Sequence, residues 1–537
     1  MSGNILIHGG PILTMDRNQP LVEAVGIING KVRAVGHRAD VKSQMGTMFD
    51  EIDLNGRMAT PGLHDAHAHI IGTGVAASEI EINADRVSSI SEIAALVKQR
   101  AQESRDGAWV IGQGYDQELL SERRHPNRAD LDAVAPNNPV VLKRSCHHIM
   151  SVNSKALELA GITANTPDPD GGTIDRDEHG QPTGVLRETA MNAVYGVVPE
   201  LTDDEVLETL ITGGSIFREH GITSVGDAGF GGGSDNRRAM IAFQRAHASG
   251  TLPVRTNMMM LIDETLDELI ELGIRTGLGD AWLRIGNAKL YTDGSIGGRT
   301  ARMLHHYNDQ PDNVGLWMED PEVMKAKIIK AHKAGFQQGS HAIGDAAITL
   351  LLDAFEQAQR EHPVENFRPR IEHCSIVSAE MLNRIQAIGA VPIPGTTFLY
   401  DMRPVYLANL GEDRARYAYA MKTFQDRGIV AAASTDAPVS LVNPMIGIQM
   451  MVTRTDRNGD AIFTEECLPL EDAIRAYTWN GAYATHTEHE KGSLEPGKLG
   501  DVTIFETDLR TVDAHSLKDV RCDYTIADGN VVHERAS

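Results

Sequence analysis

Four segments in the second half of the chain share one pattern, a run of apolar residues that ends in a polar side chain typical of catalytic sites. In a (β/α)8 barrel the catalytic side chains stand at the carboxyl ends of the strands, around one mouth. The pattern therefore predicts an α/β fold built on such a barrel. The segments are residues 283–290, 338–341, 369–373 and 429–436, and their polar residues are Lys289, His341, His373 and Asp436.

The spacing of these residues supports repeated strand–helix units. A barrel of about 250 residues uses about 31 residues for each unit. His341 and His373 are about one unit apart, and His373 and Asp436 are about two units apart. Lys289 and His341 are separated by one unit with a long loop. These intervals predict Lys289 on strand 4, His341 on strand 5, His373 on strand 6 and Asp436 on strand 8.

His67 and His69 form a His-x-His sequence that the same register places on strand 1. Alternate residues of a strand point to the same side, so the two imidazoles can bind one metal ion. The chain has 21 histidines in 537 residues, and two unrelated histidines remain an alternative for this pair alone. The interval from His69 to Lys289 exceeds three units and leaves roughly 130 residues for an insertion after strand 1.

Both ends of the chain contain short strand-like segments, whereas the middle alternates strands and helices. Asn29-Gly30 is a hairpin signal between two of these strands. Ser89 with Glu92 predicts a helix start, because the two form a capping box before an apolar stripe. We therefore predict a small β-sandwich domain from both termini and a barrel domain between them. The expected ranges are 1–60 with 488–537 for the sandwich, 61–487 for the barrel, and about 75–205 for an inserted substrate-pocket segment.

The composition restricts partners and compartment. The net charge of −24 argues against nucleic acid or an anionic membrane as partner, because both require a basic surface. A small-molecule substrate is the expected partner, and a homodimer is the expected assembly. The four cysteines contain no CxxC pair, which is typical of a reducing compartment. Without a signal-peptide pattern or a run of about 18 apolar residues, the chain is expected to be cytoplasmic and not membrane-spanning.

Several segments together resemble the amidohydrolase superfamily, in particular the subgroup called amidohydrolase family 3. The resemblance covers nearly the whole chain. His64 departs from the small or apolar residue usual at its place in the motif. The matching segments are the His-x-His pair, residues 289–301, His341-Ala-Ile-Gly-Asp345, Ile371-Glu-His373, Ser434-Thr-Asp-Ala-Pro438, Asn153-Ser-Lys-Ala-Leu157 and Glu495-Pro-Gly-Lys-Leu-Gly-Asp501.

The resemblance implies a hydrolase with two divalent metal ions. His67 and His69 would bind the more buried ion together with Asp436. His341 and His373 would bind the second ion. Zinc is the expected metal because it is common at histidine-rich sites, and Mn, Fe and Co fit similar ligands.

Lys289 would bridge both ions after carbamylation by carbon dioxide, because a carbamate is anionic whereas an ammonium group repels metal ions. A hydroxide that bridges the ions would attack the substrate, since divalent ions lower the pKa of water. Asp436 would act as general base and then as general acid. The expected reaction is hydrolysis of a non-peptide C–N bond, an amide of a small organic molecule.

Two residues of the predicted insertion match segments that the subgroup places near the site. Tyr115 would cover the substrate, and His148 would bind its carbonyl or carboxylate. For both residues, simple packing remains an alternative. For the whole protein, a mononuclear metal-dependent deaminase on the same barrel and a non-catalytic metal-binding regulatory protein are the alternatives.

Each predicted ligand also has an ordinary structural explanation. Lys289 could pair with a carboxylate such as Asp293. His341 and His373 could be core histidines with satisfied hydrogen bonds. Asp436 could cap the amino end of a helix, a role compatible with catalysis.

Overall fold

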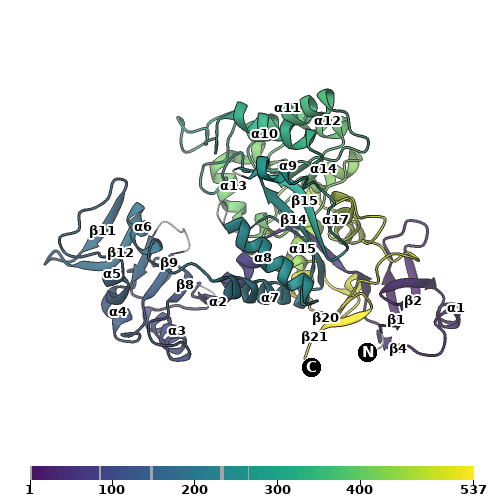
Figure 1. Cartoon of the computed structure of the whole chain (residues 1–537), viewed down its shortest axis with the longest axis horizontal. Helices are drawn as coiled ribbons and strands as arrows, with labels where there is room; N and C mark the ends of the chain where they lie inside the picture. The colour runs from purple at the N-terminus through teal and green to yellow at the C-terminus, as the bar shows by residue number, and fades with distance from the viewer. Residues whose placement is uncertain (1–2, 84–85, 145–148, 230–234, 264, 537) are drawn as a thin grey trace. The chain divides into compact units, whose positions relative to one another are not determined.

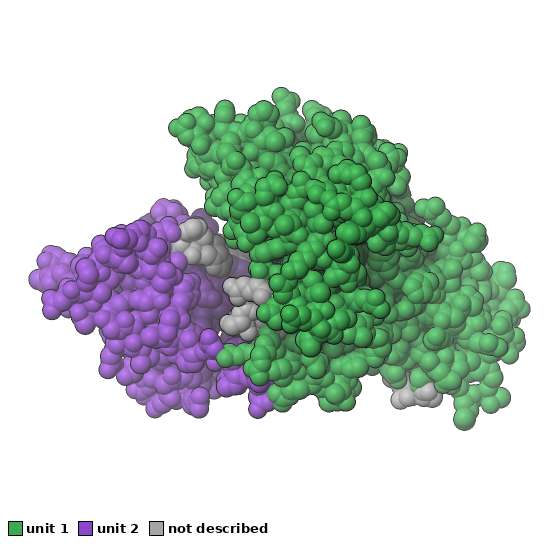
Figure 2. All heavy atoms as spheres, turned by 45° about the horizontal axis from the view of Figure 1, so that its top comes forward, with its two compact units in different colours: residues 1–74, 206–537 green, residues 75–205 purple. Residues whose placement is uncertain are grey.

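The chain divides into two compact units in this computed structural model (Figures 1 and 2). Unit 1 comprises residues 1–74 and 206–537, and unit 2 comprises residues 75–205. All predicted metal ligands belong to unit 1. The structure describes residues 3–83, 86–144, 149–229, 235–263 and 265–536.

The two ends of the chain pair in one sheet of unit 1, in the strand order β21-β20-β19-β5-β1-β2-β3, with β4 beside β1. Asn29 and Gly30 both have positive φ and join β2 to β3, which confirms the predicted hairpin. Buried side chains from both termini, such as Ile27 and Ile504, pack together. The strands are β1 (Ile5–Leu13), β2 (Leu21–Ile28), β3 (Lys31–Gly36), β4 (Asp50–Asp53), β5 (Ala59–Pro61), β19 (Val502–Phe505), β20 (Cys522–Ala527) and β21 (Asn530–Glu534).

Two parallel sheets form the centre of unit 1. Their orders are β15-β14-β13-β6 and β16-β17-β18. Parallel bridges from Ala288 to Gln338 and from Tyr291 to His341 join the two sheets. The strands are β6 (Leu63–Ala68), β13 (Ile222–Asp227), β14 (Arg255–Leu261), β15 (Leu283–Lys289), β16 (Gly339–Ala342), β17 (Arg370–His373) and β18 (Val391–Ile393).

Residues 429–436 lie between the remaining edges of these two sheets. The Ala432 N–H donates to the Pro392 carbonyl of β18 over 3.0 Å. On the other side, the Asp436 N–H donates to the His67 carbonyl of β6 over 2.9 Å. The segment thus brings Asp436 beside the His-x-His pair.

Helices follow these strands and pack against them, and α11 shows a buried face clearly. In α11, Ile348, Leu351 and Phe355 are fully buried at helical spacing. Unit 1 is therefore a mixed α/β structure with a parallel centre. Its helices include α1 (Arg38–Gln44), α8 (Asp235–Ala248), α9 (Leu266–Glu271), α10 (Pro321–Lys333), α11 (Asp345–Glu361), α12 (Ala379–Ile388), α13 (Phe398–Ala415), α14 (Met421–Asp426), α15 (Pro444–Thr453), α16 (Leu470–Ala476) and α17 (Trp479–Ala484).

Unit 2 has a six-stranded sheet in the order β11-β12-β10-β9-β8-β7. The predicted helix start is confirmed, because the Ser89 hydroxyl accepts the Glu92 N–H at the start of α3. Two helices, α2 (Ile70–Ser78) and α7 (Asp203–Glu219), run across the boundaries of the units. The other elements are β7 (Ile80–Glu81), β8 (Val110–Tyr115), β9 (Val140–Arg144), β10 (Ile149–Val152), β11 (Gly172–Arg176), β12 (Pro182–Glu188), α3 (Ile90–Glu103), α4 (Arg128–Asp132), α5 (Ser154–Leu159) and α6 (Asn192–Tyr195).

Within the described ranges, none of the helices combines the length and the apolar character needed to cross a bilayer.

Candidate metal centre

Three side chains that can bind metal meet where β6 and residues 429–436 end. The ligand atoms of His67, His69 and Asp436 all lie within 4.8 Å of one another. Nε2 of His67 is 3.5 Å and Nε2 of His69 is 3.3 Å from Oδ1 of Asp436. His67 and Asp436 are buried, and His69 is partly exposed. The hydrogen bond from the Asp436 N–H to the His67 carbonyl holds residues 429–436 and β6 in this register.

The other ring nitrogen of each histidine is already engaged. Nδ1 of His67 lies 2.5 Å from a carboxylate oxygen of Glu372, and Nδ1 of His69 lies 2.6 Å from the Gly229 carbonyl. Both partners are acceptors, so Nδ1 carries the proton and Nε2 keeps the lone pair. Metal-binding histidines usually donate their second N–H to a carboxylate or carbonyl in this way. Two imidazole lone pairs and one carboxylate oxygen therefore converge, which suits a cation.

Burial and neighbouring charges set the protonation of this cluster. Burial, followed by the charge of Lys289, holds the pKa of His67 well below its usual value, so this imidazole is neutral at neutral pH. Burial also acts to lower the pKa of His69, but the charge of the neighbouring Asp436 carboxylate raises it overall. Burial opposes the charged form of Asp436, yet the two histidines outweigh it and lower its pKa. A proton and a metal ion thus compete for the same acceptors.

His341 and His373 extend this cluster. Their ring centres are 4.6 Å apart, and the His373 ring is 4.8 Å from that of His67. Nε2 of His341 donates to the Gly294 carbonyl over 3.0 Å, which leaves the lone pair on Nδ1. Burial, followed by the charges of His341 and His67, keeps the pKa of His373 well below its usual value. The structure thus brings all four predicted histidine ligands together.

Lys289 is fully buried at the end of β15. Burial lowers its pKa to about 8, so part of the amine is neutral near physiological pH. The alternative of a pair with Asp293 does not occur in the described contacts, because that carboxylate accepts the backbone N–H groups of Arg302, Ile343 and Gly344. Nζ instead lies 5.0 Å from the centre of the Tyr291 ring.

The donor set and its unsatisfied atoms fit a divalent ion. Among the described residues, Nζ of Lys289, Nδ1 of His373 and Oδ1 of Asp436 are buried without a hydrogen-bond partner. Buried polar atoms are rarely left unpaired, because each costs free energy on folding. Imidazole nitrogens with carboxylate oxygens are the usual ligands of zinc and of similar transition metals.

Three residues of the site have an uncommon backbone conformation. His373, Cys374 and Asp436 have φ of 67°, 41° and 58°, in the left-handed region that favours glycine. Such strained residues cluster at active sites, where the surrounding structure holds a side chain in a required direction. Asp436 is not a helix cap, and that alternative is wrong: α15 begins at Pro444 and Asn443 caps it.

Sequence reasoning missed the residues that hold the ligands in place. Glu372 accepts from His67 and is itself bound by Arg370, with Nε to Oε1 at 2.7 Å; both residues are fully buried. The sequence signal was an Arg-x-Glu pair inside a buried strand, where charged residues occur only when paired. Asp227 accepts the backbone N–H groups of Ile70 and Gly229, which fixes the carbonyl that holds His69.

Asp65 ties β6 to residues 429–436. Its carboxylate accepts the Thr435 hydroxyl over 2.5 Å and the Thr435 N–H over 3.1 Å. Burial raises the pKa of Asp65 to about 7, against the effect of these hydrogen bonds. This contact fixes the strand that carries both histidines.

The two predicted substrate residues belong to unit 2. Tyr115 is fully buried, and its hydroxyl lies 3.0 Å from the Ser151 hydroxyl and 3.1 Å from Nδ1 of His125. These are contacts of a packing residue, and its role at the substrate stays a prediction. His148 lies outside the described residues.

Comparison with known proteins decides the family. The model of the amidohydrolase family matches residues 50–533. This chain belongs to the amidohydrolase family. It is 32% identical over 534 residues to the protein YtcJ of Bacillus subtilis (strain 168), named as a candidate amidohydrolase, with 98% of this chain and 99% of that protein covered. It is 25% identical over 549 residues to the N-substituted formamide deformylase of Arthrobacter pascens, with 99% and 98% covered.

Solved structures agree with this assignment. The amidohydrolase is similar to a metal-dependent hydrolase from Pyrococcus horikoshii OT3, with a TM-score of 0.78, 26% sequence identity, and 95% of this chain and 99% of that chain covered. A second metal-dependent hydrolase, from Pyrococcus furiosus, gives a TM-score of 0.76 and 28% identity, with 95% and 100% covered. The amidohydrolase is therefore an enzyme, a hydrolase acting on carbon–nitrogen bonds, of a family that uses a divalent metal.

Proposed function

We propose that this amidohydrolase cleaves the amide bond of a small organic molecule at a centre of two divalent metal ions. The observation that carries the proposal is the convergence of three acceptors. Nε2 of His67, Nε2 of His69 and Oδ1 of Asp436 face one another while both Nδ1 protons are committed elsewhere. Three buried acceptors with no donor among them are costly on folding unless a cation binds them.

The remaining ligands would complete a second metal site. His341 and His373 would hold the second ion, and a carbamate on Lys289 would bridge the two. The unpaired Nζ of Lys289 and unpaired Nδ1 of His373 support this assignment. Zinc is the first choice, with Mn, Fe and Co as alternatives. When bound, the ions would polarise the substrate carbonyl and lower the pKa of water.

The side chains of this enzyme have distinct tasks around that chemistry. Asp436 would take a proton from the attacking water and deliver it to the leaving nitrogen, as general base and then general acid. Its strained backbone and its unengaged Oδ1 support this role. Glu372 and Gly229 would keep His67 and His69 in the tautomer that offers Nε2.

The fold proposal follows from the hydrogen bonds of unit 1. Seven parallel strands and residues 429–436, linked in a ring by bridges and backbone hydrogen bonds, support a (β/α)8 barrel. The shared sheet of the two termini supports a β domain built from both ends of the chain, for which we propose the sandwich form, and the contact boundary at 75–205 supports an insertion after the first barrel strand. All five histidine and aspartate ligands would then stand at one mouth.

Product analysis tests this function most directly. The metal-loaded enzyme is incubated with N-substituted formamides, the substrate class in the name of the Arthrobacter pascens relative, and with other small amides. We expect release of a primary amine and a carboxylic acid, and loss of both products in Asp436→Asn. Release of ammonia from cyclic amidines, with no amide cleaved, would contradict the proposal and favour a deaminase on the same fold.

A further inference from the structure

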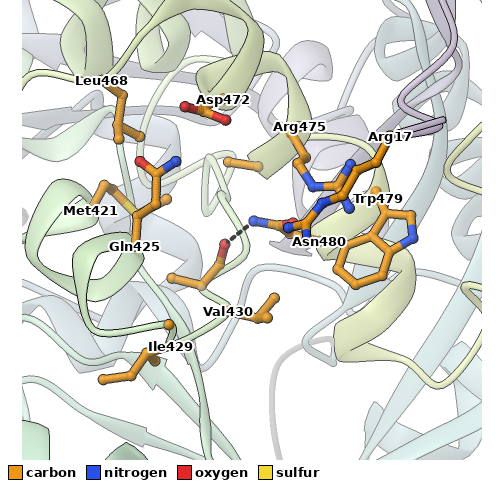
Figure 3. A pocket seen from close by; sticks show the side chains of 13 residues that line it. Arg17, Met421, Gln425, Ile429, Val430, Leu468, Asp472, Arg475, Trp479 and Asn480 are labelled. Atoms are coloured by element: carbon orange, nitrogen blue, oxygen red, sulfur yellow. Dashed lines mark hydrogen bonds between the residues drawn. The ribbon is translucent and has the colours of Figure 1, made fainter. Parts of the chain in front are cut away.

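A cavity in unit 1 lies away from the metal centre. Its volume is about 140 Å³, and Figure 3 shows its side chains. Ile429 and Ala431 line it at the beginning of the segment that ends in Asp436. Ala431 and Asp436 are five positions apart, and in extended chain their Cα atoms would be about 16 Å apart. The lining residues come from the β1–β2 connection, α14, residues 428–431, Leu468 two positions before α16, α16 itself and α17.

Two guanidinium groups face this cavity on the same side as Trp479 (Figure 3). Arg475 lies 4.3 Å from the centre of the Trp479 ring, and its Nη1 donates to the Met15 carbonyl over 2.9 Å. Arg17 has no hydrogen bond or ion pair in the part of the chain that the structure describes. The two arginines are close enough for each charge to act on the other. Apart from the bond to Met15, neither guanidinium has a hydrogen-bond partner among the described residues, so most of their donors are available for an anion.

The facing wall is largely apolar. Met421, Ile429 and Leu468 lie across the cavity from the arginines (Figure 3), and Gln425 adds an amide. The NH₂ group of Asn480 already donates to the Ala431 carbonyl over 2.8 Å. One water needs about 10–15 Å³ of such space, so the cavity holds on the order of ten waters or a ligand of several carbon atoms.

The charges of the lining residues restrict the ligand further. Arg17 and Arg475 contribute two positive charges, and Asp472 contributes one negative charge. The balance of one positive charge matches a single carboxylate and disfavours a dianion such as phosphate, which Asp472 would repel. We propose that this cavity binds a small organic monocarboxylate, with its carboxylate on Arg17 and Arg475 and its apolar part against Met421, Ile429 and Leu468.

Binding of 3-methylbutanoate by the metal-loaded enzyme tests this site. Isothermal calorimetry would be run on wild type and on Arg17→Gln, with 3-methylbutan-1-ol, succinate and inorganic phosphate as comparison probes. Arg17 is exposed and unpaired, so its removal leaves the fold intact. We expect a loss of at least about tenfold in affinity for 3-methylbutanoate in Arg17→Gln, because charge-assisted hydrogen bonds to carboxylate are lost. The neutral alcohol should not bind.

Arg33→Gln is the matched control, since it removes the same exposed charge from the terminal sheet at a distance from the cavity. Its affinity should equal that of wild type. A carboxylate held by the metal ions instead would bind equally to wild type, Arg17→Gln and Arg33→Gln, and this result would overturn the proposal. Absence of binding at millimolar concentration, or tighter binding of phosphate than of 3-methylbutanoate, would overturn it as well.

Discussion

Single protons determine what the cluster of His67, His69 and Asp436 can bind. Each imidazole presents a lone pair to Asp436 only because its Nδ1 proton is held by another group. For His67 that group is Glu372, which is buried together with Arg370. The metal affinity should therefore depend on a residue that touches no metal.

Glu372→Gln tests this dependence. The amide can present its NH₂ group to Nδ1 of His67 and shift the ring to the wrong tautomer, so we expect metal affinity to fall by about 10- to 100-fold. The same change leaves Arg370 without its counter-charge, which should lower the free energy of unfolding by about 3–5 kcal/mol. Competition with a chromophoric chelator measures the first effect, and urea unfolding measures the second.

Asp501→Asn is the matched control for this variant. It breaks another buried pair, in which Nε of Arg255 lies 2.7 Å from Oδ2 of Asp501, at the opposite end of the strands. Its unfolding free energy should also fall, by less than in Glu372→Gln because Asp528 still pairs with Arg255, while metal affinity stays at the wild-type value. An equal loss of metal affinity in both variants would show that Glu372 acts only through stability.

Lys491 predicts a pH dependence of stability away from the metal centre. Its Nζ donates to the Ser224 hydroxyl over 2.8 Å, and burial lowers its pKa to about 7. The lysine of the unfolded chain has a pKa of about 10.4 and therefore keeps its proton between about pH 7 and about pH 10.4, whereas the folded protein has lost it. Folding in this range must release the proton, which becomes easier as the pH rises. Stability should therefore rise with pH above about 7, by up to about 1.4 kcal/mol for each pH unit.

Urea unfolding of wild type and Lys491→Met at about pH 7 and about pH 9 measures this contribution, because the variant lacks the titrating group. Wild type should gain stability relative to Lys491→Met at the higher pH. A difference between the two proteins that does not change with pH would refute the assignment.

Between elements, α2 and α7 of unit 1 approach each other closely at two glycines. A Cβ on Gly213 would lie 2.0 Å from the Ile70 carbonyl oxygen, and one on Gly74 would lie 1.8 Å from the Thr209 carbonyl oxygen. The two helices therefore touch backbone to backbone. Because α2 begins directly after His69, this contact helps to position the end of β6.

Gly213→Ala should destabilise the protein by about 1–3 kcal/mol, since the added methyl group meets backbone atoms that cannot move separately. Helix propensity alone predicts the opposite sign, a gain of about 1 kcal/mol. Thr212→Ala, on the exposed side of the same helix, is the control and should be neutral or slightly stabilising. Thermal unfolding decides between the two signs, and a stabilised Gly213→Ala would disprove the close contact.

The individual elements could be predicted from local sequence, whereas their long-range contacts could not. The Asn29-Gly30 turn and the helix start at Ser89 follow from residue chemistry within a few positions, and both are confirmed. The pairing of β5 with β19, the contact of Glu372 with His67 and the crossing at Gly213 each join residues far apart in the sequence. Local patterns carry no information about such partners.

The candidate site shows the same division. The six ligand-type residues stand out because they lie at the ends of strand-like segments, and His341, His373 and Asp436 also follow the interval of strand–helix units. Their supporting residues do not stand out: Asp227 and Gly229 resemble any polar strand end and loop glycine. Asp472 with Arg17 and Arg475 likewise form a cavity only in three dimensions, because the first connection of the chain meets α16 there.

For the whole molecule, the proposed metal centre predicts that metal binding and folding of unit 1 are linked. The proposed ligands lie in β6 and directly after it, in β15, β16 and β17, and in residues 429–436, which span most of the chain. If the folded state holds the ions and the unfolded state does not, the free energy of unfolding depends on the metal concentration. The number of ions per chain is thus a property of the whole fold and separates a bridged pair from a single ion.

The most direct test of the account is the metal content per chain by elemental analysis, on wild type and Lys289→Ala grown in the same medium. The account predicts two ions in wild type and one or none in the variant, because the bridging carbamate is lost. Lys143→Ala, which removes a lysine of unit 2, should retain the wild-type content. One ion in both wild type and Lys289→Ala would contradict the account and would establish a mononuclear centre instead.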